Sequence, residues 1–236
     1  MIEKAKAPKE FAEATAQVYD QKYATQCPTH WTCCDVSESD HIVHLVEKYH
    51  RRISGPRCQG ATCLDIGCGF GFLTAAFARA GYAATGIDYS RVAVEAAWQR
   101  FRGQCEFLHM NAFEPSFQLT FDLMFCRGFS GYNTHNPSAV SDFINIYMPL
   151  LKPGGVFVLA HSTNFTGKEY NNEMPNWTRE TLRRIVAGVP ADRVVGPKFL
   201  MSRRKNRLRW FLAPIQVVMQ RRQCFLVLFR RQSTQP

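Results

Sequence analysis

The chain has 236 residues, of which 46% are hydrophobic, and this size suffices for one large α/β domain with a substantial core. It contains no uninterrupted apolar stretch of about 18 residues, which argues against a transmembrane helix. The charged N-terminus lacks the apolar centre of a secretory signal, so we expect a cytoplasmic protein. The nine cysteines are an odd number without CxxC pairs, which argues against a disulfide framework.

The formal net charge of +10 is concentrated in the C-terminal quarter. Residues 181–236 carry thirteen Lys and Arg against the single acid Asp192, which gives +12 there and about −2 in the rest of the chain. Such a surface can attract nucleic acid, a membrane surface or an anionic small molecule, or it can simply keep the protein in solution. The charge alone leaves these alternatives open.

Residues 1–60 are expected to be a helical segment that serves as lid and substrate segment, with amphipathic helices at 8–24 and 39–52. From residue 61 to 236 the pattern changes to a core of alternating elements. Strands are expected at 61–67, 83–89, 105–111, 121–128, 156–162, 193–200 and 223–230, and helices at 72–81, 91–101, 138–151 and 178–187. Short apolar strands that alternate with helices predict a mostly parallel sheet covered on both faces. A basic insertion at 202–222 has no evident role.

The stretch CLDIGCGFG, residues 63–71, places three glycines between a predicted strand and a predicted helix. Gly67, Gly69 and Gly71 would let a nucleotide-type ligand approach the backbone and the start of the helix. Asp88 ends the next strand, where an acid can accept hydrogen bonds from both ribose hydroxyls. The spacing is GxGxG, with phenylalanine at position 72, which disfavours a dinucleotide.

The motifs LDIGCGFG, GIDYS and LKPGGVFVL resemble those of the class I S-adenosylmethionine-dependent methyltransferases, over about residues 19–162. The resemblance implies a Rossmann-like seven-stranded sheet with an antiparallel last strand. It implies S-adenosylmethionine as cofactor and S-adenosylhomocysteine as product. In that family Asp65 helps to hold the amino-acid end of the cofactor, the glycines let it approach, and Asp88 binds the ribose.

Further cofactor contacts are expected on the same grounds. Asn111 would accept a hydrogen bond from the adenine amino group, with Ala112 supplying a backbone N–H and Phe113 an apolar face. Tyr89 either stacks on the adenine or is a partly buried aromatic residue. The expected set is completed by Cys68 in the glycine loop, Cys126 at the end of a strand, and Tyr19 and Tyr23. The two tyrosines lie in YDQKY, which resembles the N-terminal motif of small-molecule members, although an ordinary core helix is also compatible.

Methyl transfer from a sulfonium is an in-line displacement, so the protein mainly aligns the reactants and excludes water. A hydroxyl acceptor would benefit from a general base, and the candidates are His135 and His161. The loops at 127–137 and 163–177 are expected to line the acceptor pocket. The proposed substrate-binding residues are Arg127, Phe129, Tyr132, Asn133, Tyr170 and Trp177.

Three functions remain open from the sequence. The favoured one is methylation of an O, N or S atom of a small metabolite, including an anionic one. The second is methylation of RNA, lipid or polysaccharide docked on the basic C-terminal quarter. The third is a non-catalytic partner protein that binds the cofactor. No metal is expected, because Cys27, His30, Cys33 and Cys34 make an awkward chelate without a second ligand pair.

Overall fold

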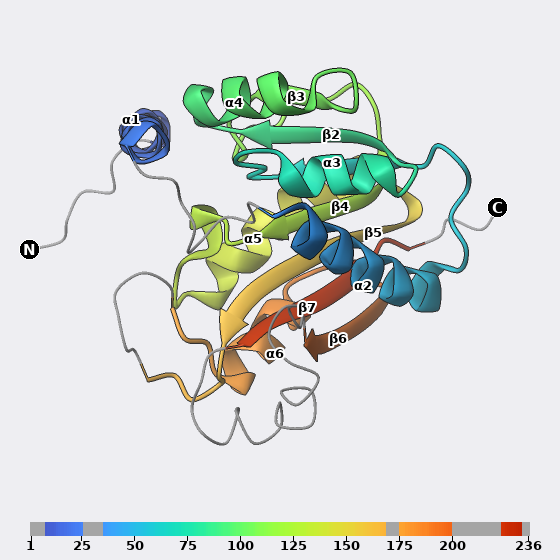
Figure 1. Ribbon diagram of the computed structural model, residues 1–236. Helices are drawn as coiled ribbons and strands as arrows, with labels where there is room; N and C mark the ends of the chain where they lie inside the picture. Colours follow the sequence, from blue (N-terminus) through green and yellow to red (C-terminus); the bar gives the residue numbers. More distant parts are fainter. Residues whose placement is uncertain (1–7, 26–34, 169–174, 200–222, 233–236) are drawn as a thin grey trace, which may run out of the picture.

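The computed structural model describes residues 8–25, 35–168, 175–199 and 223–232. Its centre is a seven-stranded sheet with strand order β3-β2-β1-β4-β5-β7-β6 (Figure 1). The strands are β1 (Thr62–Ile66), β2 (Ala83–Asp88), β3 (Glu106–His109), β4 (Phe121–Arg127), β5 (Leu151–Thr163), β6 (Arg193–Phe199) and β7 (Gln223–Arg230). Strands β1 to β5 are parallel, and β7 is antiparallel to both of its neighbours. This confirms the predicted Rossmann-like sheet with an antiparallel last strand.

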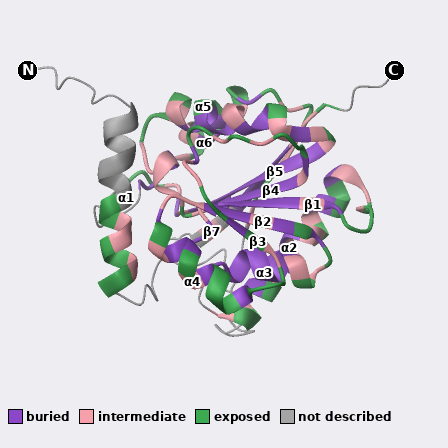
Figure 2. Cartoon of the chain, turned by 90° about the horizontal axis from the view of Figure 1, so that it is seen from above, coloured by how far each residue is buried: buried purple, intermediate pink, exposed green. Residues whose placement is uncertain are grey.

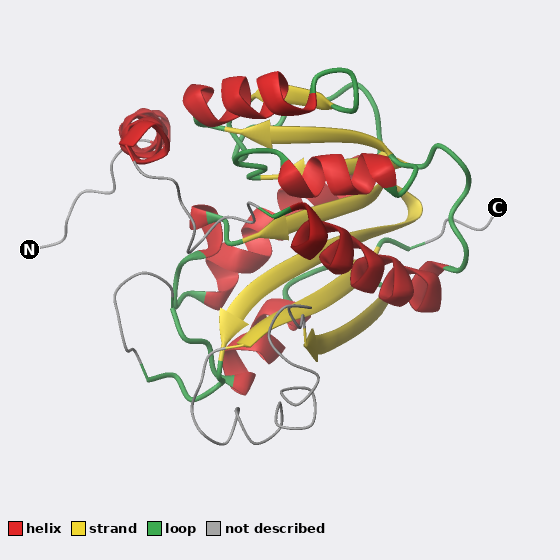
Figure 3. Ribbon diagram, in the orientation of Figure 1, coloured by secondary structure: helices red, strands yellow, loops and turns green. Residues whose placement is uncertain are grey.

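Helices cover both faces of this sheet (Figures 2 and 3). The helices are α1 (Pro8–Thr25), α2 (Val36–Ser54), α3 (Phe72–Arg79), α4 (Arg91–Phe101), α5 (Pro137–Tyr147) and α6 (Arg179–Ala187). Figure 2 shows α5 and α6 on one face and α2, α3 and α4 on the other, with the buried strands between them. The layering follows from the composition of the strands, since β1 and β4 are apolar on both faces and must be covered on both.

Helix α2 belongs to the core. Its residues Ile42, Val43 and Val46 are buried in the same cluster as Phe125 of β4 and Val158 of β5. The predicted boundary at residue 60 therefore falls after a helix that packs on the sheet. Helix α1 stands apart from the layers, on the side toward which the arrowheads of β2 and β5 point in Figure 1.

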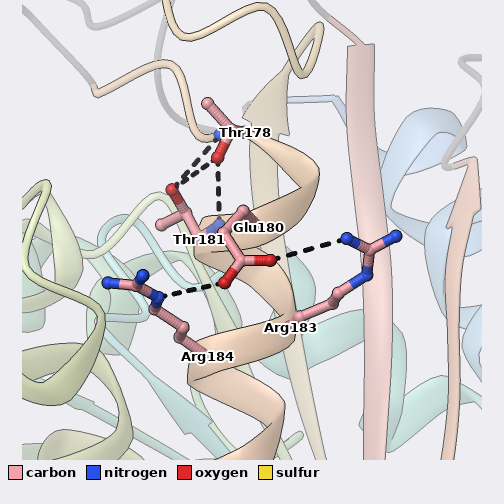
Figure 4. Close-up of polar contacts among 5 residues, drawn as sticks. All are labelled: Thr178, Glu180, Thr181, Arg183 and Arg184. Carbon is pink, nitrogen blue, oxygen red and sulfur yellow. Dashed lines mark hydrogen bonds and ion pairs between the residues drawn. The ribbon is translucent and has the colours of Figure 1, made fainter.

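Four helices begin at polar residues whose side chains accept a hydrogen bond from a backbone N–H of the first turn. These caps are Asp35 for α2, Ser90 for α4, Asn136 for α5 and Thr178 for α6. In α6 the cap is reciprocal, because the Thr181 side chain also accepts from the backbone N–H of Thr178 (Figure 4). Local capping therefore sets where these helices start.

Strand β5 is longer than predicted. It begins at Leu151, whereas the sequence predicts a start at residue 156. The register explains the difference, because Phe121 pairs with Leu151 while Leu123 pairs with Val156. The intervening residues 152–155 bulge out of the pairing, so they look like a turn in the sequence.

Among the described residues, no helix combines the length and the apolar character needed to cross a lipid bilayer.

Candidate active site

The glycine loop joins β1 to α3 at the carboxyl edge of the sheet. The backbone N–H groups of Gly67 and Cys68 both donate to the carbonyl of Ile87, each at 2.9 Å, which ties the loop to β2. Gly67, Gly69 and Gly71 have positive φ values of 73°, 52° and 78°. The loop thus has a backbone conformation that favours glycine at all three positions.

Packing inside the protein also restricts two of these positions. A Cβ atom on Gly71 would lie 2.6 Å from the ring of Phe107 and 2.8 Å from the Cβ of Ala97. A Cβ atom on Gly67 would lie 3.1 Å from the ring of Phe129. Gly71 is therefore needed for the contact of the loop with β3 and α4, a reason that differs from the ligand approach expected from the sequence.

Asp88 ends β2 beside this loop, and two backbone groups fix its carboxylate. The N–H of Gly69 donates to Oδ2 at 2.9 Å, and the N–H of Ser90 donates to Oδ1 at 2.9 Å. Burial raises the pKa of this carboxyl, and the backbone donors oppose that shift. Each oxygen keeps a further lone pair, so the carboxylate can still accept hydrogen bonds from a diol.

Asp65, the second acid, lies near the end of β1 and is 2% exposed. The hydroxyl of Thr74 donates to its carboxylate at 2.7 Å. Burial raises the pKa of Asp65 to about 7, while the Thr74 hydrogen bond and the charge of Arg127 pull it down. Asp65 is therefore poised to gain or lose a proton near neutral pH.

Arg127, at the end of β4, is one of the residues expected to contact the acceptor. Its positive charge opposes the rise in pKa that burial causes for the carboxyl of Asp65 and for the thiol of Cys224 in β7. The guanidinium thus lies near the end of β1 and the start of β7.

The residues expected around the adenine lie together after β3. The Asn111 carboxamide oxygen accepts the N–H of Phe113 at 3.0 Å, so it already closes a local turn and has one lone pair left for a ligand. Ala112 is buried, and its carbonyl accepts the hydroxyl of Tyr147 at 2.6 Å. Phe113 is 40% exposed and offers an apolar surface.

Tyr89 directly follows Asp88, and its ring stacks on His109 at a centroid distance of 5.8 Å. The His109 Nε2 atom also hydrogen-bonds the Tyr89 carbonyl at 2.9 Å. One partner for the Tyr89 ring is therefore a protein side chain. Cys68 and Cys126 are both buried, and Cys126 is fully so, which makes its side chain part of the core rather than of a ligand surface.

The loop after β4, called the acceptor loop below, packs against these residues through Phe129. The Phe129 ring stacks on Phe143 at 4.8 Å and lies 5.8 Å from Phe113. Asn133 is half-buried and His135 is exposed. Phe129 thus connects the acceptor loop with both the glycine loop and the adenine side.

Two residues expected to bind the acceptor lie inside the protein. Tyr132 is 0% exposed, and its hydroxyl donates to the Ala160 carbonyl at 2.8 Å. Trp177 is 2% exposed, and its indole N–H donates to the Thr134 carbonyl at 3.0 Å. Both side chains support the loop that carries His135 from beneath, which corrects their assignment to the pocket surface.

His161, the other candidate base, is 4% exposed and stacks on Trp177 with ring centroids 3.7 Å apart. Its Nε2 atom lies 2.9 Å from the Pro175 carbonyl, which can only accept, so Nε2 carries the proton. That nitrogen cannot take a proton from an acceptor while the bond persists. The geometry therefore favours a structural role for His161.

Helix α1 brings its last turns to the same edge. The Tyr23 ring meets Phe70 of the glycine loop edge-on at 4.9 Å, and Tyr19 lies 6.4 Å from Tyr23. Asp20, between them, accepts hydrogen bonds from Ser90 and Val92 at the start of α4. No local pattern in the sequence points to a role for Asp20, although the YDQKY motif contains it.

Several expected features lie outside the described residues. These are Tyr170, the cysteines and histidine at 27–34, and the basic insertion at 202–222. In the described part of the chain, no three His, Cys, Asp or Glu side chains are grouped so as to hold a metal ion.

In the described part of the basic C-terminal quarter, five arginines have partners within the chain. Arg183 and Arg184 pair with Glu180 at 3.5 and 3.1 Å (Figure 4). The remaining three are Arg193 and Arg230, which donate to the Ile53 carbonyl at the end of α2, and Arg231, which donates to the carbonyls of Pro149 and Leu151. Part of the positive charge therefore serves the fold.

Comparison with known proteins agrees with this geometry. Residues 63–155 match a family model described as a methyltransferase domain. A mitochondrial ubiquinone biosynthesis O-methyltransferase from Schizosaccharomyces pombe is 31% identical over 107 residues, which are 43% of this chain and 38% of that protein. These matches place a methyltransferase domain at residues 63–155, and the chain spans about two fifths of the length of the curated relative.

Solved structures resemble this chain over almost its whole length. The magnesium protoporphyrin IX methyltransferase of Synechocystis PCC 6803, with bound S-adenosylmethionine, has a TM-score of 0.60 at 13% identity and covers 96% of this chain and 100% of its own. The Burkholderia thailandensis 1,6-didemethyltoxoflavin-N1-methyltransferase has a TM-score of 0.62 at 16% identity, with coverages of 99% and 94%. At these identities the likeness shows the shared fold. The cytoplasmic location of this chain stays a prediction.

Proposed function

We propose that this methyltransferase transfers a methyl group from S-adenosylmethionine to an O, N or S atom of a small metabolite. The observation that carries the proposal is the carboxylate of Asp88, which the N–H groups of Gly69 and Ser90 hold at the mouth of the glycine loop. A carboxylate fixed in this way is prepared to accept two hydroxyl donors, which is what a ribose offers.

The other residues of the edge fit the rest of the cofactor. Asp65 would hold the methionine ammonium, and Phe113 would cover the adenine from the apolar side. Bound S-adenosylmethionine supplies an electrophilic methyl group on a sulfonium sulfur. The chain's own contribution is to orient both reactants and to exclude water, with Phe129 between the glycine loop and the acceptor loop.

Where the acceptor is a hydroxyl, His135 is the base we propose. It is exposed on the loop after β4, and Tyr132 and Trp177 hold that loop from the core side. An amine acceptor would need only to arrive uncharged, and a thiol could react as thiolate. Arg127, at the end of β4, supports an acceptor that carries an anionic group.

The small-molecule class is supported by the aromatic residues Phe113 and Phe129 beside the glycine loop and by the names of the similar proteins. A porphyrin, a toxoflavin precursor and a ubiquinone precursor are all compact molecules with ring systems. Ion pairs of Arg183 and Arg184 with Glu180, and of Arg230 with Asp192, weaken the alternative of a polymer docked on the basic quarter, since these charges are partly balanced within the chain.

Label transfer tests the proposal. The purified protein is given methyl-labelled S-adenosylmethionine together with separate cell fractions of small metabolites, lipids with polysaccharides, and RNA, and Asp88→Ala serves as the site-deficient control. We expect label in the small-metabolite fraction with the unaltered protein and little with the variant. Label confined to RNA or to lipid and polysaccharide would replace the small-molecule proposal by the polymer alternative.

A further inference from the structure

Helix α1 is joined to the body of the protein by a short set of contacts at the cofactor edge. Its Asp20 carboxylate accepts the hydroxyl of Ser90, with the two oxygens 2.5 Å apart, and the backbone N–H of Val92 at 3.3 Å. Three residues later along α1, Tyr23 packs on Phe70 of the glycine loop. The described end of α1 therefore touches both elements that frame the proposed ribose site.

The contact with α4 is a helix cap supplied from another part of the chain. Ser90 is the local N-cap and accepts the N–H of Ala93 at 3.2 Å, while Asp20 accepts from Val92, 72 residues away in sequence. The start of a helix carries unpaired N–H groups and partial positive charge, so a carboxylate is favoured there. Asp20 and Ser90 together satisfy two donors of the first turn.

Ser90 also belongs to the proposed ribose site. Its backbone N–H donates to Asp88 Oδ1 at 2.9 Å, while its hydroxyl donates to Asp20. Ser90 itself is fully buried, so neither bond can be exchanged for water without moving the chain. One residue therefore holds the orientation of Asp88 through its backbone and the position of α1 through its side chain.

The two carboxylates also interact through their charges. The negative charge of Asp20 opposes ionisation of Asp88 and raises the pKa of the latter, in addition to the larger effect of burial. Two hydroxyl donors on Asp88 would stabilise its charge and offset this repulsion. The link through Ser90 acts against this repulsion, because docking of α1 holds the residue whose N–H fixes Asp88. Through that link, docking should strengthen ribose binding, and ribose binding should favour docking to the same extent.

We infer that Asp20 is a positioning residue that couples the docking of α1 to cofactor binding, through Ser90 and Asp88. The inference rests on the proposed cofactor site and adds a residue that does not touch the cofactor itself. It assigns the role of lid to α1 alone, because α2 is packed on the sheet.

The test compares Asp20→Ala with Gln21→Ala, its exposed neighbour on the same helix. Calorimetry gives the dissociation constant of S-adenosylhomocysteine, and trypsin cleavage after Lys22, with and without S-adenosylhomocysteine, reports the docking of α1. In the unaltered protein we expect the ligand to slow cleavage after Lys22. Asp20→Ala should raise the dissociation constant of S-adenosylhomocysteine about tenfold. Trypsin should cleave this variant faster after Lys22, and the ligand should give it little protection. Gln21→Ala should behave as the unaltered protein.

A double-mutant cycle with Ser90→Ala separates this coupling from general damage. Ser90→Ala keeps the backbone N–H that donates to Asp88 but removes the hydroxyl that donates to Asp20. If both side chains act through one link, the double variant binds S-adenosylhomocysteine about as weakly as the weaker single variant.

Strictly additive losses in the cycle would overturn the inference. An unchanged dissociation constant in Asp20→Ala, with faster cleavage after Lys22, would do so as well, because α1 would then dock without any effect on the ligand. Failure of the unaltered protein to bind S-adenosylhomocysteine is a different result, and it would refute the cofactor site itself.

Discussion

The carboxylate of Asp88 and the backbone N–H of Gly69 lie 2.9 Å apart, and this bond joins the end of β2 to the middle of the glycine loop. The bond thereby fixes the glycine loop and the end of β2, 19 positions apart in the chain, relative to each other. Because the acid is fixed before any ligand arrives, little of the binding energy is lost in ordering it.

Asp88→Ala should raise the dissociation constant of S-adenosylhomocysteine about 30-fold or more. Two hydrogen bonds to a charged group are lost, and a loss of about 2 kcal/mol corresponds to that factor. Calorimetry measures the effect, and Glu95→Ala, an exposed acid on α4, is the matched control. Equal affinities for Asp88→Ala and the unaltered protein would show that the ribose lies elsewhere.

Binding of S-adenosylhomocysteine should weaken below about pH 7. Burial raises the pKa of Asp65 to about 7, so the ligand-free protein gains a proton there as the pH falls. A methionine ammonium requires the ionised form, so the dissociation constant should rise by up to about tenfold per pH unit below 7 and level off above it. In Asp65→Asn this dependence should be absent.

The same pKa predicts how stability changes with pH. The folded carboxyl binds its proton more tightly than the unfolded one, so the contribution of Asp65 to stability is most favourable at low pH. That contribution declines as the pH rises from about 4 to about 7, and it stays constant above. Denaturant titrations of the unaltered protein and Asp65→Asn check it, and identical pH profiles would contradict the assigned pKa.

We expect His135 to contribute to catalysis and His161 to stability. With a hydroxyl acceptor, His135→Ala should lower kcat about 100-fold or more, because a general base is lost. His161→Ala should leave kcat within a few-fold and lower the free energy of unfolding by about 3 kcal/mol, since a buried ring and its hydrogen bond are removed. His44→Ala, an exposed histidine on α2, controls for surface effects. A large kcat loss in His161→Ala alone would reverse the assignment.

Gly71→Ala should destabilise the protein by about 3 kcal/mol. The substitution combines a positive φ of 78° with a Cβ 2.6 Å from the Phe107 ring, so backbone strain and overpacking add. Gly103→Ala is the matched control, because its φ of 77° is similar but no atom lies within 4 Å of the added Cβ. It should cost about 1 kcal/mol, which is the strain alone. Equal losses in urea unfolding would show that the contact with Phe107 is unimportant.

The order of strands and helices could be predicted because short apolar runs alternate with capped helices along most of the chain. The glycine loop and Asp88 could be located for the same reason, since both follow directly from the ends of predicted strands. The start of β5 could not be predicted. Residues 152–155 bulge out of the ladder, and the pairing of Leu151 before them depends on contacts with β4. Sequence periodicity does not report such contacts.

The roles of individual side chains depended on tertiary packing. Tyr132 and Trp177 lie in loop-like sequence beside the predicted site, yet both are buried against His161. From the sequence alone, an aromatic residue in such a loop can equally line a pocket or pack beneath it. Asp20 was missed because its partners begin 70 residues later, and a cap of this length has no local signal.

A crystal structure of the protein with S-adenosylhomocysteine is the most direct measurement. We predict both ribose hydroxyls within hydrogen-bonding distance of Asp88, the methionine ammonium near Asp65, and the sulfur facing the loop that carries His135. A ligand whose ribose contacts neither oxygen of Asp88 would contradict the proposed cofactor site.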